Sequence, residues 1–233
     1  MTFLWARQAT ELLLGLALLQ HSLEHCAVAS RERPLFIARA VLALLLAASV
    51  TTTWFSPRWI ELALLLVSVL ILTRFRGPYN GGADRMGYLI LLCLCLSRWL
   101  PEPRWQEAAL GYLAVQLTLS YAASGWVKIV NADWRSGVAL TDVFRFSAYP
   151  ASESLRGWSH WPRLLLTMSW LLMLFEILFP LAVLNTYTLY AALAVAIALH
   201  LVNAFLFGLN RFLWIWIAAY PSILWLQQRL IAN

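Results

Sequence analysis

Long apolar runs follow one another along most of the chain and are separated by short polar breaks. A bilayer core about 30 Å thick requires about 20 apolar residues per helix. Eight stretches meet or nearly meet this length: 9–29, 35–54, 59–73, 86–100, 106–129, 163–184, 187–208 and 211–228. The pattern predicts an all-α, polytopic membrane bundle of about eight transmembrane helices, with a range of seven to nine because the third and fourth runs are short.

One long connection interrupts this series, over residues 131–162, and it is rich in Trp and Tyr. Connections of this length within a compact domain are usually functional or disordered. Aromatic side chains gather where a membrane meets water. We therefore expect a single transmembrane domain over residues 1–233, with 131–162 as a long interfacial loop within it.

The composition agrees with a membrane location. Hydrophobic residues make up 62% of the chain and charged residues 12%, whereas soluble domains carry about 25% charged residues. The mean hydropathy is +0.71. These values exclude a disordered, collagen-like or ordinary cytosolic protein, and they place the chain in a lipid bilayer.

The net charge of +6 has an uneven origin, because Lys128 is the only lysine among the 17 basic residues. The Arg residues stand singly or in pairs at the ends of the apolar runs, where membrane topology places them. A nucleic-acid-binding protein would instead carry a basic stripe with exposed aromatics, so no nucleic-acid partner is expected. Arg is denser in alternate loops, which favours both termini outside the cytoplasm.

The first apolar run resembles a signal peptide, with Arg7 before it and small residues at its end. Glu11 precedes the apolar core, however, and polar side chains follow it before any cleavage site, which a signal peptide would not have. We therefore expect a helix that is retained. The string from His21 to His25 reads H-x-x-E-H, a pattern of zinc proteases, but no third ligand stands beside it. Together with three cysteines that form no CxxC pair, this predicts neither a metal site nor a disulfide framework.

Ionisable side chains inside a membrane segment are costly and are therefore functional candidates. Lys128 ends the predicted helix 106–129 on a polar row with a spacing of four, formed by Gln116, Ser120, Ser124 and Lys128. Tyr121 and Gly125 flank this row, and Gly125 allows a backbone or a ligand to approach closely. A desolvated lysine can lose its proton and act as a base, whereas arginine stays charged. A lysine that only reaches toward the headgroups is the alternative reading.

Three further polar residues lie within predicted membrane helices. Glu176 occupies the middle of 163–184, far from any basic residue of that helix, so it is either protonated or paired with a cation such as Lys128. His200 and Asn203 lie one turn apart in 187–208, and a hydrogen-bonded structural histidine is the alternative there. Asp84 opens the predicted helix 86–100 after Gly81-Gly82, which predicts a helix-capping residue or a tight turn that a ligand approaches.

Three ordered stretches resemble the HTTM (horizontally transferred transmembrane) domain superfamily over about residues 70–225. The first is Tyr79-Asn-Gly-Gly-Ala-Asp-Arg-Met86. The second is similar to Y-x-x-[SA]-G-x-x-K followed by W-x-x-G-x-A and is formed here by Tyr121, Ser124, Gly125, Lys128, Trp134, Gly137 and Ala139. The third is Glu176 in its helix, then His200 ahead of Gly208 and Phe212.

The superfamily includes the vitamin K-dependent gamma-carboxylase and bacterial membrane proteins that mature a sporulation-delaying toxin peptide. The resemblance implies that Lys128 matches the carboxylase's membrane-side lysine base, which deprotonates reduced vitamin K. The carboxylase has a lysine pair and a large lumenal domain, neither of which has a counterpart here. We therefore expect a smaller relative that is closer to the toxin-maturation proteins.

Two functions remain open at this stage. The first is a membrane enzyme, with Lys128, Glu176 and His200 as catalytic residues and a quinone or vitamin K-like hydroquinone as cofactor. Its cofactor-binding residues are expected to be Asp84, Tyr121, Ser124, Gly125 and Asn203. The second is a non-enzymatic chaperone, export partner or complex subunit, in which Lys128 forms a structural ion pair. Either would work in the lipid bilayer of a bacterial inner (cytoplasmic) membrane, with a peptide substrate or a partner membrane protein.

Overall fold

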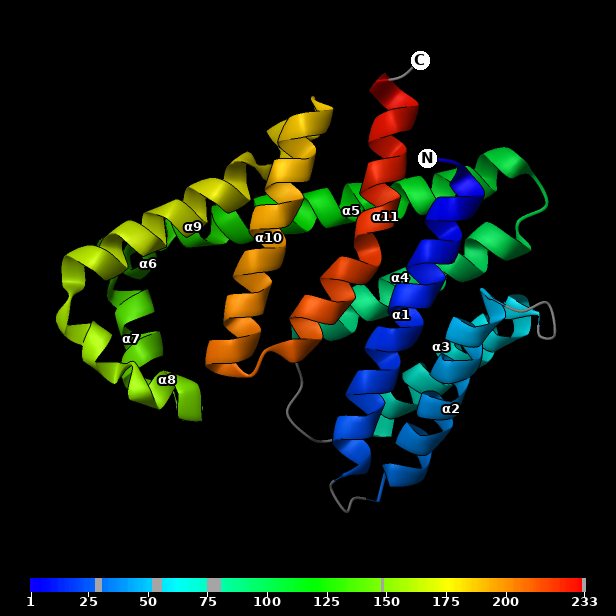
Figure 1. The fold of residues 1–233 in the computed structure, drawn as a ribbon, viewed down its shortest axis with the longest axis horizontal. Helices are drawn as coiled ribbons and strands as arrows, with labels where there is room; N and C mark the ends of the chain where they lie inside the picture. The colour runs from blue at the N-terminus through cyan, green and yellow to red at the C-terminus, as the bar shows by residue number, and fades with distance from the viewer. Residues whose placement is uncertain (28–30, 52–55, 75–80, 148, 232–233) are drawn as a thin grey trace. The chain divides into compact units, whose positions relative to one another are not determined.

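The computed structural model describes residues 1–27, 31–51, 56–74, 81–147 and 149–231, and all the regular elements within these ranges are helices (Figure 1). The long helices are α1 (Phe3–Cys26), α2 (Arg33–Ser49), α3 (Pro57–Arg74), α4 (Gly81–Trp99), α5 (Pro103–Val130), α9 (Pro162–Ala182), α10 (Thr186–Phe207) and α11 (Asn210–Ile231). The short ones are α6 (Ala132–Ser136), α7 (Val138–Phe146), α8 (Pro150–Ser154) and the 3₁₀ helix η1 (Arg156–His160). The all-α prediction is therefore confirmed.

Each of the eight predicted apolar runs coincides with one long helix, but only part of the membrane prediction is confirmed. Among the described residues, α5, α9 and α10 are long and apolar enough to cross a membrane. α2 has 17 residues and is short for a span. α4 has Asp84 in its first turn and Arg98 in its last turn, and such charged side chains lower the apolarity of a helix. The count of eight spans is not confirmed.

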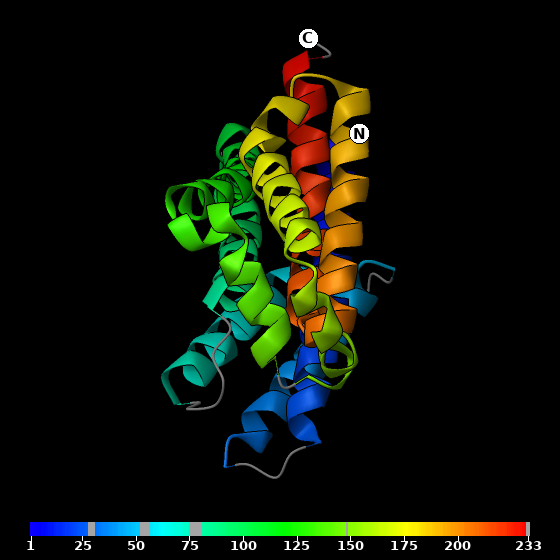
Figure 2. The same cartoon turned by 90° about the vertical axis from the view of Figure 1, so that its left-hand side faces the viewer.

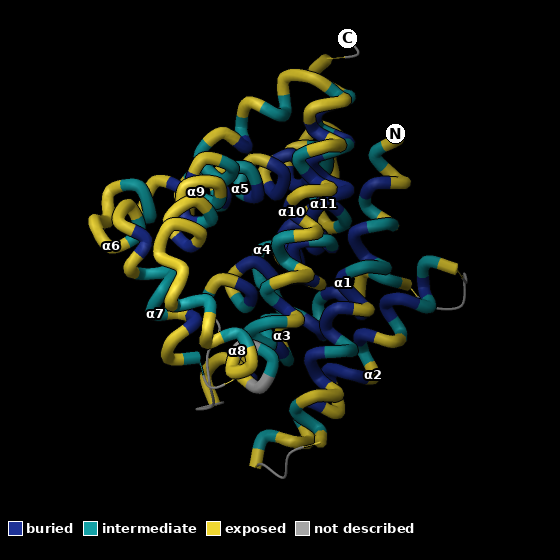
Figure 3. The backbone as a smooth tube through the Cα atoms, turned by 60° about the vertical axis from the view of Figure 1, so that its left-hand side comes forward, coloured by how far each residue is buried: buried dark blue, intermediate teal, exposed yellow. Residues whose placement is uncertain are grey.

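The described residues form two compact units. Unit 1 consists of Met1–Val115 and Trp214–Asn233. Within it α1, α2, α3 and α4 pack in chain order, and α1 also contacts α4. A Cβ atom at Gly15 would lie 2.8 Å from the carbonyl oxygen of Ala43, so this glycine lets α1 and α2 approach closely. Figure 3 shows the buried residues along the facing sides of these two helices.

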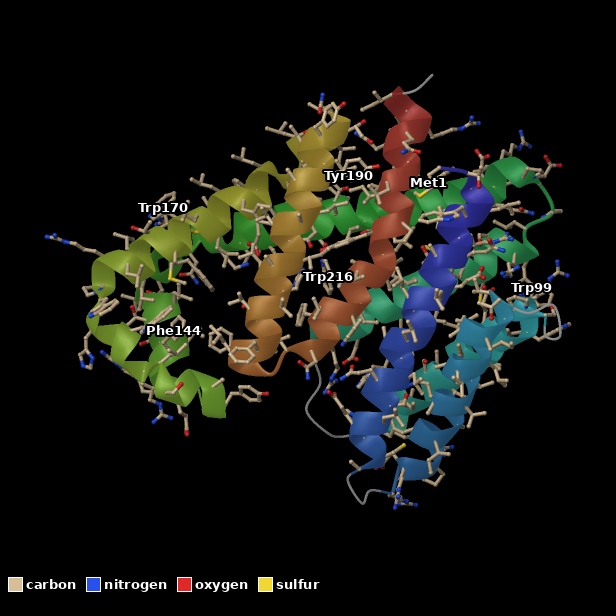
Figure 4. All side chains as sticks on the ribbon, in the orientation of Figure 1. Met1, Trp99, Phe144, Trp170, Tyr190 and Trp216 are labelled. Carbon is tan, nitrogen blue, oxygen red and sulfur yellow. The ribbon has the colours of Figure 1, made fainter. Side chains whose placement is uncertain are left out.

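Unit 2 consists of Gln116–Leu213. Here the segment 131–162, expected as a long loop, is helical over α6, α7, α8 and η1 (Figures 1 and 2). Gly137 joins α6 to α7 with φ of +80°, a left-handed conformation that favours glycine. The buried Phe144 ring packs on Trp158 and Phe207 (Figure 4). The segment is thus a packed part of unit 2, and its position at a membrane surface stays a prediction.

The sequence predicted either a helix-capping residue or a tight turn at Asp84, and the described residues there do not include a separate turn. Gly81 and Gly82 are the first residues of helix α4, so they do not form a separate tight turn. Asp84 lies in the first turn of that helix, where a carboxylate interacts favourably with the helix dipole. Tyr79 and Asn80, which belong to the same predicted motif, lie outside the described residues.

Candidate functional site

Lys128 and Glu176 form an ion pair between α5 and α9 in unit 2. The Lys128 Nζ atom donates to both carboxylate oxygens, at 2.9 Å to Oε1 and 2.6 Å to Oε2. The side chains retain 18% and 13% of their exposure. The sequence allowed a pairing of Glu176 with Lys128, and the structure shows it. A pair this well buried is held by charge-assisted hydrogen bonds that little water competes for.

The ion pair is close because α5 and α9 touch through Gly125. A Cβ atom at this position would lie 2.5 Å from the backbone nitrogen of Ile177, the residue after Glu176. The absent side chain therefore brings Glu176 within reach of Lys128, one turn further along α5. The close approach predicted at Gly125 is present and its partner is a backbone. A cofactor contact at this glycine stays a prediction.

Trp134 is a functional candidate that reasoning from single ionisable residues missed. Its ring centroid lies 5.4 Å from Lys128 Nζ, in the geometry of a cation–π contact. Ser169 Oγ donates to the Trp134 carbonyl oxygen over 2.6 Å, and Trp170 Nε1 donates to the Arg135 carbonyl oxygen over 3.1 Å. These bonds hold α6 on α9 beside the ion pair. The only sequence signal was the place of Trp134 in the W-x-x-G-x-A motif.

Tyr121 and His200 form a second polar pair in the same unit. The Tyr121 hydroxyl and His200 Nε2 lie 3.0 Å apart, joining α5 to α10. The Tyr121 ring is stacked on Phe179 at 4.1 Å between centroids, and the His200 ring is stacked on Phe212 at 6.4 Å. Both polar groups are thus set in an aromatic cluster from α5, α9, α10 and the start of α11.

The other predicted site residues lie outside these two polar pairs. Ser124 has an exposed side chain, and its carbonyl oxygen accepts a long contact of 3.5 Å from Lys128 Nζ. Asn203 is half-buried in α10, one turn after His200. Asp84 belongs to unit 1, so no geometry relates it to Lys128. The polar row on α5 is not one continuous site, because the Ser120 hydroxyl bonds to the Leu117 carbonyl oxygen of its own helix.

The H-x-x-E-H string lies in unit 1 and carries other interactions. Arg39 Nη2 lies 3.2 Å from His21 Nδ1, and Arg39 Nε donates to Ser22 Oγ over 2.8 Å. Glu24 accepts a hydrogen bond from Gln20. Within the ranges that the structure describes, no group of three or more His, Cys, Asp or Glu side chains is arranged to hold a metal ion.

Unit 2 therefore has the parts that proton chemistry needs. A lysine is hydrogen-bonded to a carboxylate, so one proton can be shared between Nζ and Oε2 without any large movement. A phenol and an imidazole, also within hydrogen-bonding distance, form a second donor–acceptor pair. Both pairs lie on α5, α9 and α10, which are the three helices, among those the structure describes, that are long and apolar enough to cross a membrane.

Comparison with known proteins places these helices in a family. The model of the HTTM domain family matches residues 100–227, which is more than half of the chain and includes α5, α9 and α10. No curated protein and no solved structure matches the chain. The match contains Lys128, Glu176, Tyr121 and His200, and lies on the apolar helices. The chain is a membrane protein that belongs to the HTTM domain family.

Proposed function

We propose that this chain is an integral membrane enzyme that modifies or matures a peptide or a lipid, with Lys128 as its base and a lipid-soluble, quinone-like cofactor. The observation that carries the proposal is the Lys128–Glu176 pair, which joins the sole lysine of the chain to a carboxylate of a mainly apolar helix. A structural cation at a helix end would serve equally well as arginine, which the chain uses everywhere else.

Glu176 provides a way to make Lys128 a base. Transfer of one proton from Nζ to Oε2, over a contact of 2.6 Å, converts an ammonium–carboxylate pair into a neutral amine and a neutral carboxylic acid. A low dielectric favours the neutral forms over separated charges. The neutral amine has a lone pair that can accept the proton of a weakly acidic hydroxyl, which makes Nζ an ammonium again, and Glu176 then releases its own proton to water to restore the ion pair. Glu176 is therefore the proton store in this proposal.

The residues around Lys128 fit a lipid-soluble ring compound. Lys128 keeps 18% of its side-chain exposure, so it can be reached. The rings of Tyr121, Phe175 and Phe179 pack on one another between α5 and α9, the two helices that carry the ion pair. A quinone-like cofactor would supply a weakly acidic hydroxyl and a redox couple when bound. Tyr121, Ser124, Gly125 and Asn203 are the unit 2 residues proposed to hold it.

His200 completes the proposed catalytic group. Its Nε2 atom shares a hydrogen bond with the Tyr121 hydroxyl, which fixes the direction of the imidazole. An imidazole held in this way can set the protonation of a group bound beside Tyr121. We assign to His200 the role of a proton donor or acceptor that is separate from the Lys128–Glu176 pair.

The proposal extends to the membrane topology. α5, α9 and α10 would cross the bilayer, and α1, α2, α3, α4 and α11 would complete a bundle of about eight helices in a bacterial inner membrane. Both termini would lie outside the cytoplasm, because Arg is denser in the alternate loops. The enzyme would be closer to the toxin-maturation relatives than to the gamma-carboxylase, because Lys128 stands alone where the carboxylase has a lysine pair.

A second candidate function is a membrane chaperone, export partner or complex subunit. It is favoured by the bidentate geometry of the ion pair together with the tight packing of Gly125 on α9. Both features stabilise helix packing without any chemistry. In this reading Lys128 stays protonated throughout.

Mass spectrometry of the organic extract of purified protein tests the enzyme proposal. We expect a stoichiometric isoprenoid quinone from the wild type and from the control Glu107→Gln, which changes a carboxylate in unit 1. We expect its loss from Lys128→Ala. Wild-type protein without a bound quinone would contradict the proposed cofactor.

Lys128→Arg separates the two candidates. Arginine retains the charge and can pair with Glu176, but it cannot give up its proton. The enzyme proposal predicts a folded protein that has lost biological activity. If Lys128→Arg keeps full activity, the base role is wrong and the structural pair is supported.

A further inference from the structure

A second buried cluster of charges lies in unit 1, before the residues that the family model matches. Arg98 of α4 donates from Nη2 to Glu11 Oε1 over 2.6 Å and from Nε to Glu61 Oε1 over 2.9 Å. Glu11 comes from α1 and Glu61 from α3, so one guanidinium joins three helices. The Glu11 and Glu61 side chains are 1% and 0% exposed.

Each carboxylate of this cluster uses only one of its two oxygens. Oε2 of Glu11 and Oε2 of Glu61 are buried and accept no hydrogen bond from any residue that the structure describes. Buried polar atoms almost always have a hydrogen-bond partner, so two such oxygens in one cluster require an explanation. Both carboxyl groups bind the same guanidinium through Oε1, which holds them side by side.

Arg7 does not complete the cluster as a second hydrogen-bonded cation. Its Nε atom lies 3.5 Å from Glu11 Oε1 and has no hydrogen-bond partner among the described residues. Its Nη1 atom donates to the Ser97 carbonyl oxygen over 3.3 Å instead. One guanidinium is thus hydrogen-bonded to two carboxyl groups. With both ionised, the two carboxylates balance the charges of Arg98 and Arg7, but two buried oxygens remain unsatisfied.

We propose that Glu11 and Glu61 share one proton and form a proton-binding site in the unit 1 helix bundle. The proton lies on Oε2 of one carboxyl group and is donated to Oε2 of the other. This single O–H···O bond satisfies both buried oxygens. Two carboxylates held at one site cannot both ionise without strong mutual repulsion.

Further charged or titratable groups near Glu11 and Glu61 lie on α3, α4 and α2. On α3, Arg58 donates to the Arg98 carbonyl oxygen and stacks on Trp99. On α4, Cys95 is the remaining titratable side chain whose charge would act on Glu61. On α2, the buried Arg39 contacts His21 and Ser22 on a later part of α1.

A shared proton at this place makes unit 1 a proton-binding unit, which is a role separate from that of the Lys128 site. Exchangeable protons on buried carboxyl groups are the elements from which membrane proteins build proton relays. The site joins α1, α3 and α4 through atoms that change their bonding when the proton leaves. It is therefore a reversible proton-binding site that does not depend on a quinone or on Lys128.

Infrared spectroscopy of the purified full chain tests this site. At neutral pH we expect the carbonyl band of a protonated carboxylic acid. The band should shift when Glu is labelled with ¹³C, and again in D₂O. It should be lost in Glu61→Gln and in Glu11→Gln. Glutamine has the shape of a protonated glutamate and can donate to the remaining carboxylate, so these variants are expected to keep the fold.

Two controls assign the band. Glu176→Gln and Glu107→Gln should retain it, because these carboxylates belong to other ion pairs. A wild-type spectrum without a ¹³C-sensitive acid band would overturn the proposal, and this measurement requires no variant. So would a band that disappears in Glu176→Gln, or one that survives in both Glu11→Gln and Glu61→Gln.

Discussion

Lys128 Nζ and Glu176 Oε2 lie 2.6 Å apart, although the two residues are separated by 48 positions in the chain. The contact joins the last turn of α5 to the second half of α9. Both residues occur in helices that are apolar enough for a membrane, where an unpaired charge is expensive. Each residue therefore explains why the other is tolerated.

Removal of one partner should destabilise unit 2 more than removal of both. Glu176→Leu leaves the Lys128 ammonium buried without its carboxylate, and we expect a loss of about 3 kcal/mol in the free energy of unfolding. Lys128→Met/Glu176→Leu replaces the pair with apolar side chains and should recover most of this loss. Denaturant unfolding in one detergent of the wild type, Glu176→Leu, Lys128→Met and the double variant completes the double-mutant cycle.

The cycle also has an outcome that contradicts the pair. If the double variant loses the sum of the two single losses, Lys128 and Glu176 act independently. The ion pair would then contribute nothing to the stability of the fold.

Gly125 should be intolerant of even one added methyl group. In Gly125→Ala the new Cβ would lie 2.5 Å from the Ile177 nitrogen, which is a backbone atom and cannot rotate away. Overpacking of this kind costs about 1 to 3 kcal/mol. The same separation of α5 from α9 would lengthen the Lys128–Glu176 contact.

Gly111→Ala is the matched control for this substitution, because both glycines belong to α5. A Cβ atom at Gly111 meets Leu226 at 3.7 Å, an ordinary contact. Alanine is favoured over glycine in a helix by about 1 kcal/mol, so Gly111→Ala should be neutral or stabilising. Equal thermal shifts of the two variants would show that Gly125 does not limit the approach of α9.

The positions of the helices along the chain were predictable from the sequence, whereas the contacts between helices were not. Apolar runs of about 20 residues report helix length directly, and all eight runs coincide with helices. How many of them cross a membrane depends on charged residues such as Glu11, Glu61 and Arg98. These three residues lie inside predicted runs, and the sequence pattern contains no information on their mutual contacts.

For the candidate site too, individual residues could be predicted from the sequence, but their contacts could not. The spacing along α5 pointed to Lys128 and Gly125, since residues four apart share a helix face. It offered Glu176 as a partner for Lys128, but gave no distance between the two. Trp134 was missed because its contact with Lys128 depends on how α6 is held against α9, by the hydrogen bonds from Ser169 and Trp170. Long-range packing of this kind has no local sequence signal.

Tyr121→Phe should weaken unit 2 slightly and selectively. The substitution removes the 3.0 Å hydrogen bond to His200 Nε2 but keeps the ring that stacks on Phe179. A single hydrogen bond contributes about 0.5 to 1.5 kcal/mol, so we expect a small decrease in melting temperature. Tyr112→Phe, which alters an exposed tyrosine of the same helix, should cause no change. If the two variants melt alike, the Tyr121–His200 bond is not formed in the protein.

Arg98 should be far more important for stability than Arg229, although each pairs with glutamate in unit 1. Arg98→Met leaves Glu11 and Glu61 buried without the guanidinium that bridges them, and breaking a buried ion pair costs about 3 to 5 kcal/mol. Arg229 pairs with Glu107 over 3.5 Å, with side chains that are 56% and 37% exposed. Surface pairs contribute up to about 1 kcal/mol, so Arg229→Met should unfold almost as the wild type does. Denaturant titration under identical conditions compares the two. Equal losses would mean that the unit 1 cluster is open to water, and its three-helix bridge would then lose its structural importance.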